Sequence, residues 1–79
     1  MKARVFVTLK PGVLDPQGKA VARSLVGIGF GEVASARLGK VVELELSGDD
    51  VTAARARLDQ MCRKLLANTV IEDYRIEVG

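Results

Sequence analysis

Few side chains in this sequence could take part in catalysis or hold a metal ion. The 79 residues include no histidine and one cysteine, Cys62. A cysteine nucleophile needs a neighbouring base, and a structural zinc site uses four Cys or His ligands. Neither arrangement can be assembled here, and a disulfide within the chain is impossible. We therefore expect Cys62 to be a packed thiol on a helix.

Two pairs of adjacent carboxylates are the remaining candidates for acid–base chemistry. Asp49 and Asp50 precede a predicted helix, where Asp commonly caps the first backbone N–H groups. Glu72 and Asp73 begin a predicted strand, so their side chains point to opposite faces. Neither pair is accompanied by a second cluster at metal-ligand spacing. The sequence thus predicts no catalytic residue, no cofactor-binding residue and no metal ligand.

A glycine-rich stretch, residues 27–31, has two functional interpretations that we reject. A phosphate loop needs its glycines before a helix, whereas these follow one and precede a predicted strand. The stretch 29–33 partly matches an RNA-binding signature, but Glu32 replaces the stacking aromatic. The chain has only three aromatic residues and a net charge of +2. We therefore predict no nucleic-acid partner.

The sequence also gives no sign of a membrane or an export pathway. No apolar run approaches the roughly 20 residues needed to span a bilayer. The N-terminus leads into a short alternating segment and lacks the apolar core of a signal peptide. We predict no membrane partner and a cytoplasmic location, where a lone cysteine stays reduced.

Hydrophobic periodicity predicts a chain of four strands and two helices. Val5, Val7 and Leu9 share one face of the first strand, and clean alternation marks the third and fourth. The predicted strands are residues 4–10, 32–38, 41–46 and 70–78, and the predicted helices are residues 16–26 and 51–66. Gly39-Lys40 is the expected two-residue hairpin between the second and third strands.

The two predicted helices have recognisable caps and apolar faces. Asp15-Pro16 suits the start of the first helix, because Asp caps it and Pro fits its first turn. The apolar side of that helix is marked by Val21, Leu25 and Ile28. Steps of three and four residues define the apolar stripe of the second helix, which comprises Val51, Ala54, Leu58, Met61 and Leu65.

The element order is therefore β-α-β-β-α-β in a single domain, residues 1–79. Right-handed crossovers place both helices on one face of an antiparallel sheet. The predicted class is α+β, a two-layer sandwich of the ferredoxin-like type, with residues 32–38 and 70–78 as edge strands. A chain of this size buries only about 62% of its surface on folding, so we expect self-association to stabilise it.

The loop that opens the first helix is richer in fixed-backbone residues than a simple connector requires. Residues 10–18 contain two prolines and two glycines beside polar side chains. Rigidly held loops often carry function. Lys10, Gln17 and Lys19 are placed to meet a partner or an anion at the start of the helix. Charge is also uneven, because residues 1–40 carry seven Lys/Arg and two Asp/Glu, whereas residues 41–79 carry five and eight.

This loop, with Gly29-Phe30, Gly39-Lys40 and residues 64–74, resembles the PurS family. PurS is the small subunit of phosphoribosylformylglycinamidine (FGAM) synthase in purine biosynthesis. The resemblance spans essentially the whole chain, and its most specific segments are Val-Leu-Asp-Pro-Gln-Gly at 13–18 and Leu-Leu-Ala-Asn-Thr-Val-Ile-Glu-Asp-Tyr at 65–74. One departure is Thr69, where family members usually have Pro.

The resemblance implies a non-catalytic assembly subunit of a glutamine-dependent, ATP-consuming C–N ligase. It implies a homodimer or homotetramer that bridges a PurQ-type glutaminase and a PurL-type synthetase and aids ammonia transfer. ATP and Mg would be used by the synthetase, with no cofactor on this chain. The candidate interface residues are Lys10, Asp15, Gln17, Lys19, Asn68 and Tyr74. The alternative is a small regulatory domain that binds an amino acid or nucleotide at a dimer interface.

Overall fold

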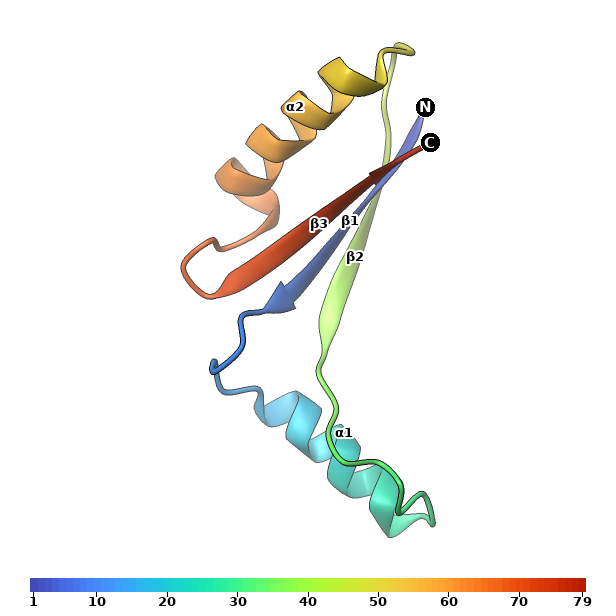
Figure 1. Cartoon of the computed structure of the whole chain (residues 1–79), viewed down its shortest axis with the longest axis vertical. Coiled ribbons are helices and arrows are strands. Elements are labelled where there is room, and N and C mark those ends of the chain that lie inside the picture. Colours follow the sequence, from blue (N-terminus) through green and yellow to red (C-terminus); the bar gives the residue numbers. More distant parts are fainter.

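The computed structural model describes all residues, 1–79, as an antiparallel three-stranded sheet with helices outside it (Figure 1). Along the chain, the elements are β1 (Lys2–Leu9), α1 (Pro16–Gly27), β2 (Gly39–Glu45), α2 (Val51–Met61), the π-helix η1 (Cys62–Leu66) and β3 (Glu72–Val78). The predicted α+β class and antiparallel sheet are confirmed. Three strands are present where four were predicted.

The central strand of the sheet is β1, with β2 and β3 as its two edges. Val5 of β1 lies opposite Val42 of β2 and Ile76 of β3, so all three strands turn apolar side chains to the same face. This is the face predicted from the alternating pattern. The order β2-β1-β3 is that of a ferredoxin-like sheet without its second strand.

The core lies between this face and the second helical segment. Its buried members are Ala3, Val5, Val7, Leu58, Cys62 and Ala67. Leu58 and Cys62 are fully buried, and burial raises the pKa of the Cys62 thiol. The prediction of a packed thiol is confirmed. A core of six buried residues is small, which agrees with the marginal burial expected from chain length.

The predicted helix 51–66 changes geometry partway along. Regular α2 ends at Met61, and η1 follows with a wider turn in which the Ala67 N–H donates to the Cys62 carbonyl. The wider turn shifts the side chains that follow it. Leu65 is 83% exposed, and Ala67 is buried. The prediction that Leu65 belongs to the buried stripe is therefore wrong.

The predicted strand 32–38 does not form. This segment follows a turn at Gly29 and runs back alongside α1, where the Phe30 N–H bonds to the Leu25 carbonyl and the Leu38 N–H to Asp15. Ala34, Ser35 and Ala36 have weak strand propensity. The free edge of β2 therefore has no partner strand within the chain.

Gly39 and Lys40 are not a hairpin either, because they are the first residues of β2. Gly39 pairs with Thr8, and a Cβ at Gly39 would lie 2.4 Å from the Val7 carbonyl oxygen. Glycine is required here for close approach of two strands, whereas the hairpin prediction assumed a positive φ.

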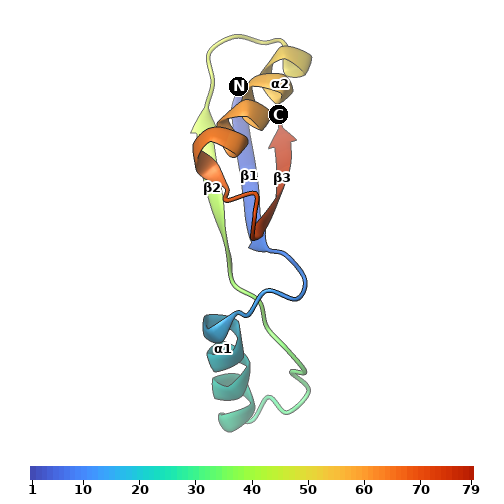
Figure 2. The ribbon, with the colours of Figure 1, turned by 90° about the vertical axis from the view of Figure 1, so that its left-hand side faces the viewer.

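The first helix lies beyond the end of the sheet and covers none of its face (Figures 1 and 2). The prediction of two helices on one face is therefore wrong for α1. Residues 11–38, hereafter the arm, leave the end of β1 and return to the start of β2. The chain measures 48 × 25 × 14 Å with a radius of gyration of 15.9 Å, whereas a compact domain of this length has about 12 Å.

Candidate partner interface

A single carboxylate joins the two segments at the base of the arm. Asp15 caps α1, and its Oδ1 accepts a bond of 2.8 Å from the Gly18 N–H. Its Oδ2 accepts a bond of 3.0 Å from the Leu38 N–H, on the segment that returns to β2. The Leu38 bond first, and then the Gly18 bond, hold the pKa of Asp15 below its usual value. The base of the arm is thus fixed by a charged group.

Gly18 allows these two segments to come close together. A Cβ at this position would lie 2.4 Å from the Ala36 carbonyl oxygen and 2.6 Å from Asp15 Oδ2. Any other residue would push the returning segment away or displace the capping carboxylate. The glycine in the predicted functional loop therefore has a structural role at the arm base.

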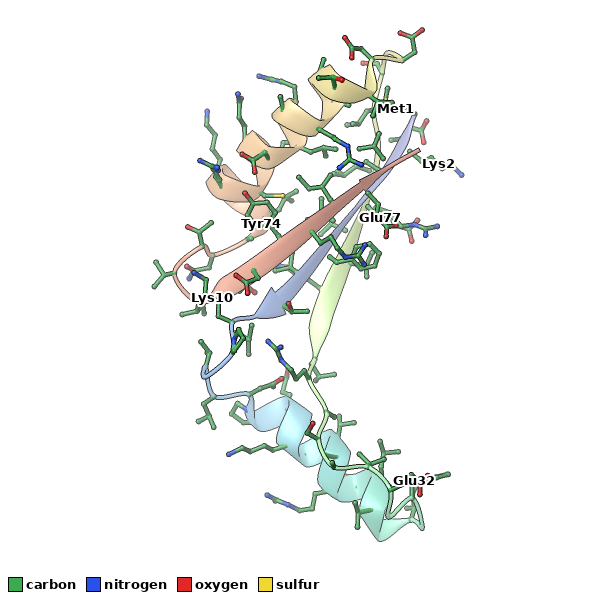
Figure 3. The ribbon with its side chains drawn as sticks, in the orientation of Figure 1. Met1, Lys2, Lys10, Glu32, Tyr74 and Glu77 are labelled. Atoms are coloured by element: carbon green, nitrogen blue, oxygen red, sulfur yellow. The ribbon has the colours of Figure 1, made fainter.

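A wide hollow at the base of the arm, hereafter the basic concavity, is lined by Lys10, Lys19 and Arg37. Its volume is about 530 Å³. Lys10 stands where β1 meets the arm (Figure 3), Lys19 is on α1, and Arg37 is on the returning segment. No carboxylate forms an ion pair with any of them. Three unpaired cations from separate segments thus converge on one hollow.

Asn68 lies in the loop between η1 and β3 and shapes that loop. Its side-chain Oδ1 accepts a bond from the Val70 N–H, and the backbone N–H of Asn68 donates to Glu72 Oε1. The Lys10 N–H donates to the Ile71 carbonyl at 2.8 Å. This last bond brings the loop beside the base of the arm. The candidates Asn68 and Lys10 therefore lie in neighbouring segments.

Tyr74 connects β3 to α2 through a small polar network. Its hydroxyl donates to Asp59 Oδ1, and Arg63 Nε lies 3.0 Å from Asp59 Oδ2. The bond to the Asp59 carboxylate raises the pKa of Tyr74, and the contact with Tyr74 raises the pKa of Arg63. Tyr74 is therefore engaged within its own chain.

The structure thus divides the six candidate residues into two groups. Asp15, Asn68 and Tyr74 each have a side-chain oxygen that is hydrogen-bonded within the chain. No such side-chain bond holds Lys10, Gln17 and Lys19, and Gln17 and Lys19 are exposed. Contact with a partner remains a prediction for all six. Arg37 was not predicted as an interface residue, because it was assigned to the strand predicted at 32–38. Its positive charge is the only feature of the sequence that could have indicated such a role.

Two apolar surfaces also remain uncovered. A groove of about 360 Å³ beside α2 and η1 is lined by Leu44, Met61, Leu65 and Leu66, with polar residues at its rim. It is hereafter the α2 groove. The arm exposes a second set of apolar side chains, among them Val21, Val26, Ile28 and Phe30. Unfilled apolar surfaces of this kind mark interaction sites.

No helix of the chain has the length and apolar character needed to cross a membrane. No three His, Cys, Asp or Glu side chains gather where they could hold a metal ion.

The sequence matches the family model described as "PurS: Phosphoribosylformylglycinamidine (FGAM) synthase" over residues 2–79. The chain belongs to the PurS family. The subunit PurS of FGAM synthase from Bacillus subtilis is 49% identical over 77 residues, which cover 98% of this chain and 90% of that protein. The FGAM synthase subunit named by the sequence resemblance is confirmed.

Solved PurS structures share the elongated architecture described above. PurS from Methanocaldococcus jannaschii has a TM-score of 0.89 and 37% identity, with 99% of this chain and 94% of that one covered. A chain of the PurLQS structure from Thermotoga maritima has a TM-score of 0.88 and 30% identity, with 96% and 93% covered. The arm that extends beyond the sheet therefore belongs to a fold shared with other PurS chains.

Proposed function

We propose that this chain is a non-catalytic assembly subunit of FGAM synthase that joins a PurL-type synthetase to a PurQ-type glutaminase. The observation that carries the proposal is the similarity to a chain of the Thermotoga maritima PurLQS structure. In this proposal, ATP and Mg are used by the synthetase, and ammonia released from glutamine reaches it within the assembly. A cytoplasmic location is part of the proposal, since Cys62 is a free thiol.

Reconstitution of the three subunits tests this function directly. We expect glutamine-dependent formation of the amidine to require all three, because ammonia must pass between two proteins held together. Ammonia supplied in solution bypasses that need, so the synthetase with ammonia is the matched control. Equal glutamine-dependent rates with and without this chain would refute the assembly role.

The finer proposal is that the chain is a homodimer. Its accessible surface is 5768 Å², whereas a compact protein of this mass exposes about 4,700 Å². The excess is about 1,100 Å² per chain, or about 2,200 Å² for two, within the range of obligate homodimer interfaces. The elongated shape and the exposed apolar side chains of the arm account for this excess.

The second copy also has a place to bind. In a ferredoxin-like sandwich the first helix lies beside the second on the sheet, but here that helix is in the arm and the α2 groove is unfilled. We propose that the arm of one copy fills the α2 groove of the other. Two-fold symmetry would fill both grooves at once and cover the exposed apolar side chains of both arms.

Sedimentation measures this association. We expect a mass above the 8.5 kDa of one chain and dissociation by Ile28→Glu, because Ile28 is a 72% exposed apolar residue on the arm. Val70→Glu is the control, since Val70 is 80% exposed but lies outside the arm and the groove. A wild-type mass near 8.5 kDa would refute the dimer.

The sequence left open a regulatory domain that binds an amino acid or a nucleotide. Membership of the PurS family favours the assembly subunit over that domain. Calorimetry of the isolated chain with glutamine, ADP and ATP separates the two, because tight binding without partner subunits is expected only of a regulatory domain.

A further inference from the structure

We propose that the basic concavity at the base of the arm holds a carboxylate-bearing segment of a partner subunit. The proposal rests on the assembly function and adds to it the surface and the chemistry by which a partner is held. Lys10, Lys19 and Arg37 line the concavity. Lys10 directly follows β1, Lys19 is on α1, and Arg37 is on the returning segment.

Only two of the chain's 12 Lys and Arg side chains form an ion pair, and Lys10, Lys19 and Arg37 differ from the other unpaired cations in lining one hollow. Arg63 and Arg75 each pair with a carboxylate of the chain, but no such pair involves Lys10, Lys19 or Arg37. Three positive charges against the single carboxylate of Asp15 leave the hollow net positive, and a net positive hollow attracts an anion. The basic concavity is thus a place where a bound carboxylate would gain from several charges at once.

A small free anion such as phosphate is the wrong occupant. It would normally bind at the helix N-terminus, where backbone N–H groups are free. In α1, the Gly18 N–H already donates to Asp15 Oδ1, and the Lys19 N–H donates to the Asp15 carbonyl. The Asp15 carboxylate also lines the concavity and would repel an anion at that position.

The wall of the concavity favours a peptide segment. Pro11, Val13 and Leu14 line it together with the cations, and Leu14 is 65% exposed. A volume of about 530 Å³ holds several side chains. A segment with acidic residues next to an apolar one can reach the separate cations and also cover Leu14. This combination of a charged rim and an apolar contact is typical of protein interfaces.

A different subunit fits better than a second copy of this chain. The acidic half of the chain, residues 41–79, has most of its carboxylates engaged already. Those that accept a hydrogen bond or form an ion pair within the chain are Glu45, Asp50, Asp59, Glu72 and Glu77. A second copy therefore offers only Glu43, Asp49 and Asp73 of that half free of such contacts, whereas the acidic residues of a partner subunit are not limited to these three.

The test compares two charge reversals on the same helix. Lys19→Glu changes a cation of the concavity, and Arg23→Glu makes the same change one turn further along α1, outside it. Association with purified PurL-type and PurQ-type subunits is measured by calorimetry at low and high salt. We expect about tenfold weaker association and a smaller salt dependence for Lys19→Glu, and less than about twofold weakening for Arg23→Glu. Lys10→Glu provides a second reversal in the concavity and should match Lys19→Glu.

The possible results are distinguishable. If the wild-type chain binds neither subunit, the assembly function itself fails, and this inference fails with it. If wild type binds and both reversals in the concavity weaken binding no more than Arg23→Glu, only the inference is overturned. Two further results would overturn it by naming another occupant: lowered mass of the isolated chain with Lys19→Glu indicates a second copy, and competition by millimolar inorganic phosphate indicates a small anion. Unchanged far-ultraviolet circular dichroism of each variant confirms that the arm is folded.

Discussion

Two leucines that share one predicted helix face should differ sharply in their contribution to stability. Leu58 is fully buried against β1, whereas Leu65 is 83% exposed after the π-helical turn. Leu58→Ala removes three buried carbon groups, worth about 2.4 kcal/mol at roughly 0.8 kcal/mol each. The cavity left behind adds to this, so we expect a loss of about 3–5 kcal/mol in the free energy of unfolding. For Leu65→Ala we expect less than about 0.5 kcal/mol within one chain.

Urea denaturation at two protein concentrations measures both effects. The loss in Leu58→Ala should appear at each concentration, because the cavity lies inside one chain. Any effect of Leu65→Ala should depend on concentration, since Leu65 lines the groove proposed for a second copy. The total stability expected for 79 residues is roughly 4–12 kcal/mol. Leu58→Ala therefore removes a large part of it, and the volume-conserving Leu58→Met, at less than about 1.5 kcal/mol, keeps the measurement possible.

One outcome would contradict this reasoning. If Leu65→Ala lowers the midpoint as much as Leu58→Ala at every concentration, then the helix continues without the π-helical turn and Leu65 faces the core. Equal and small effects of both variants would instead mean that the helix does not pack on the sheet at Leu58.

Three further predictions follow from particular contacts. Gly18→Ala should speed amide hydrogen exchange throughout α1, because its Cβ would meet the Ala36 carbonyl, whereas Gly27→Ala has open space and should not. Tyr74 has a raised pKa, so its contribution to stability is present below about pH 10 and is lost as pH rises through the folded-state value. Tyr74→Phe should remove that part of the alkaline loss in a series of denaturation midpoints. Cys62 is fully buried, so a maleimide should label it only at the rate at which the chain opens, and labelling at the rate of a free thiol would contradict its burial.

Much of the sheet and core was predictable from local patterns. Alternation of apolar and polar residues placed Val5 and Val7 inward, and the structure buries both. Asp15 and Asp50 were recognised as helix caps, and each accepts a bond from a backbone N–H of its helix. These features depend on neighbours within a few residues, so the sequence contains the information.

The wrong predictions concern features that the local spacing of apolar residues does not encode. Residues 32–38 could pair with β2 or lie along α1, and the close approach of Ala36 to Gly18 decides for α1. The change from α2 to η1 likewise rotates Leu65 out of a stripe that its spacing supports. Spacing alone cannot indicate an extra residue in a helical turn.

The candidate interface shows the same division. Lys10, Gln17 and Lys19 were found from a polar, conformationally fixed loop, and the structure leaves their side chains without bonds in the chain. Arg37 was missed because it is distant in sequence and reaches the concavity only when the arm folds back.

The sequence by itself determined the family, the apolar face of the sheet and the absence of histidine and of a second cysteine. Only the tertiary structure showed that α1 lies outside the sheet and that three cations meet at its base. The physical reason is that periodicity tells which side of a helix seeks burial but not where that burial occurs. The apolar side of α1 is visible in the sequence, and within one chain it stays largely exposed.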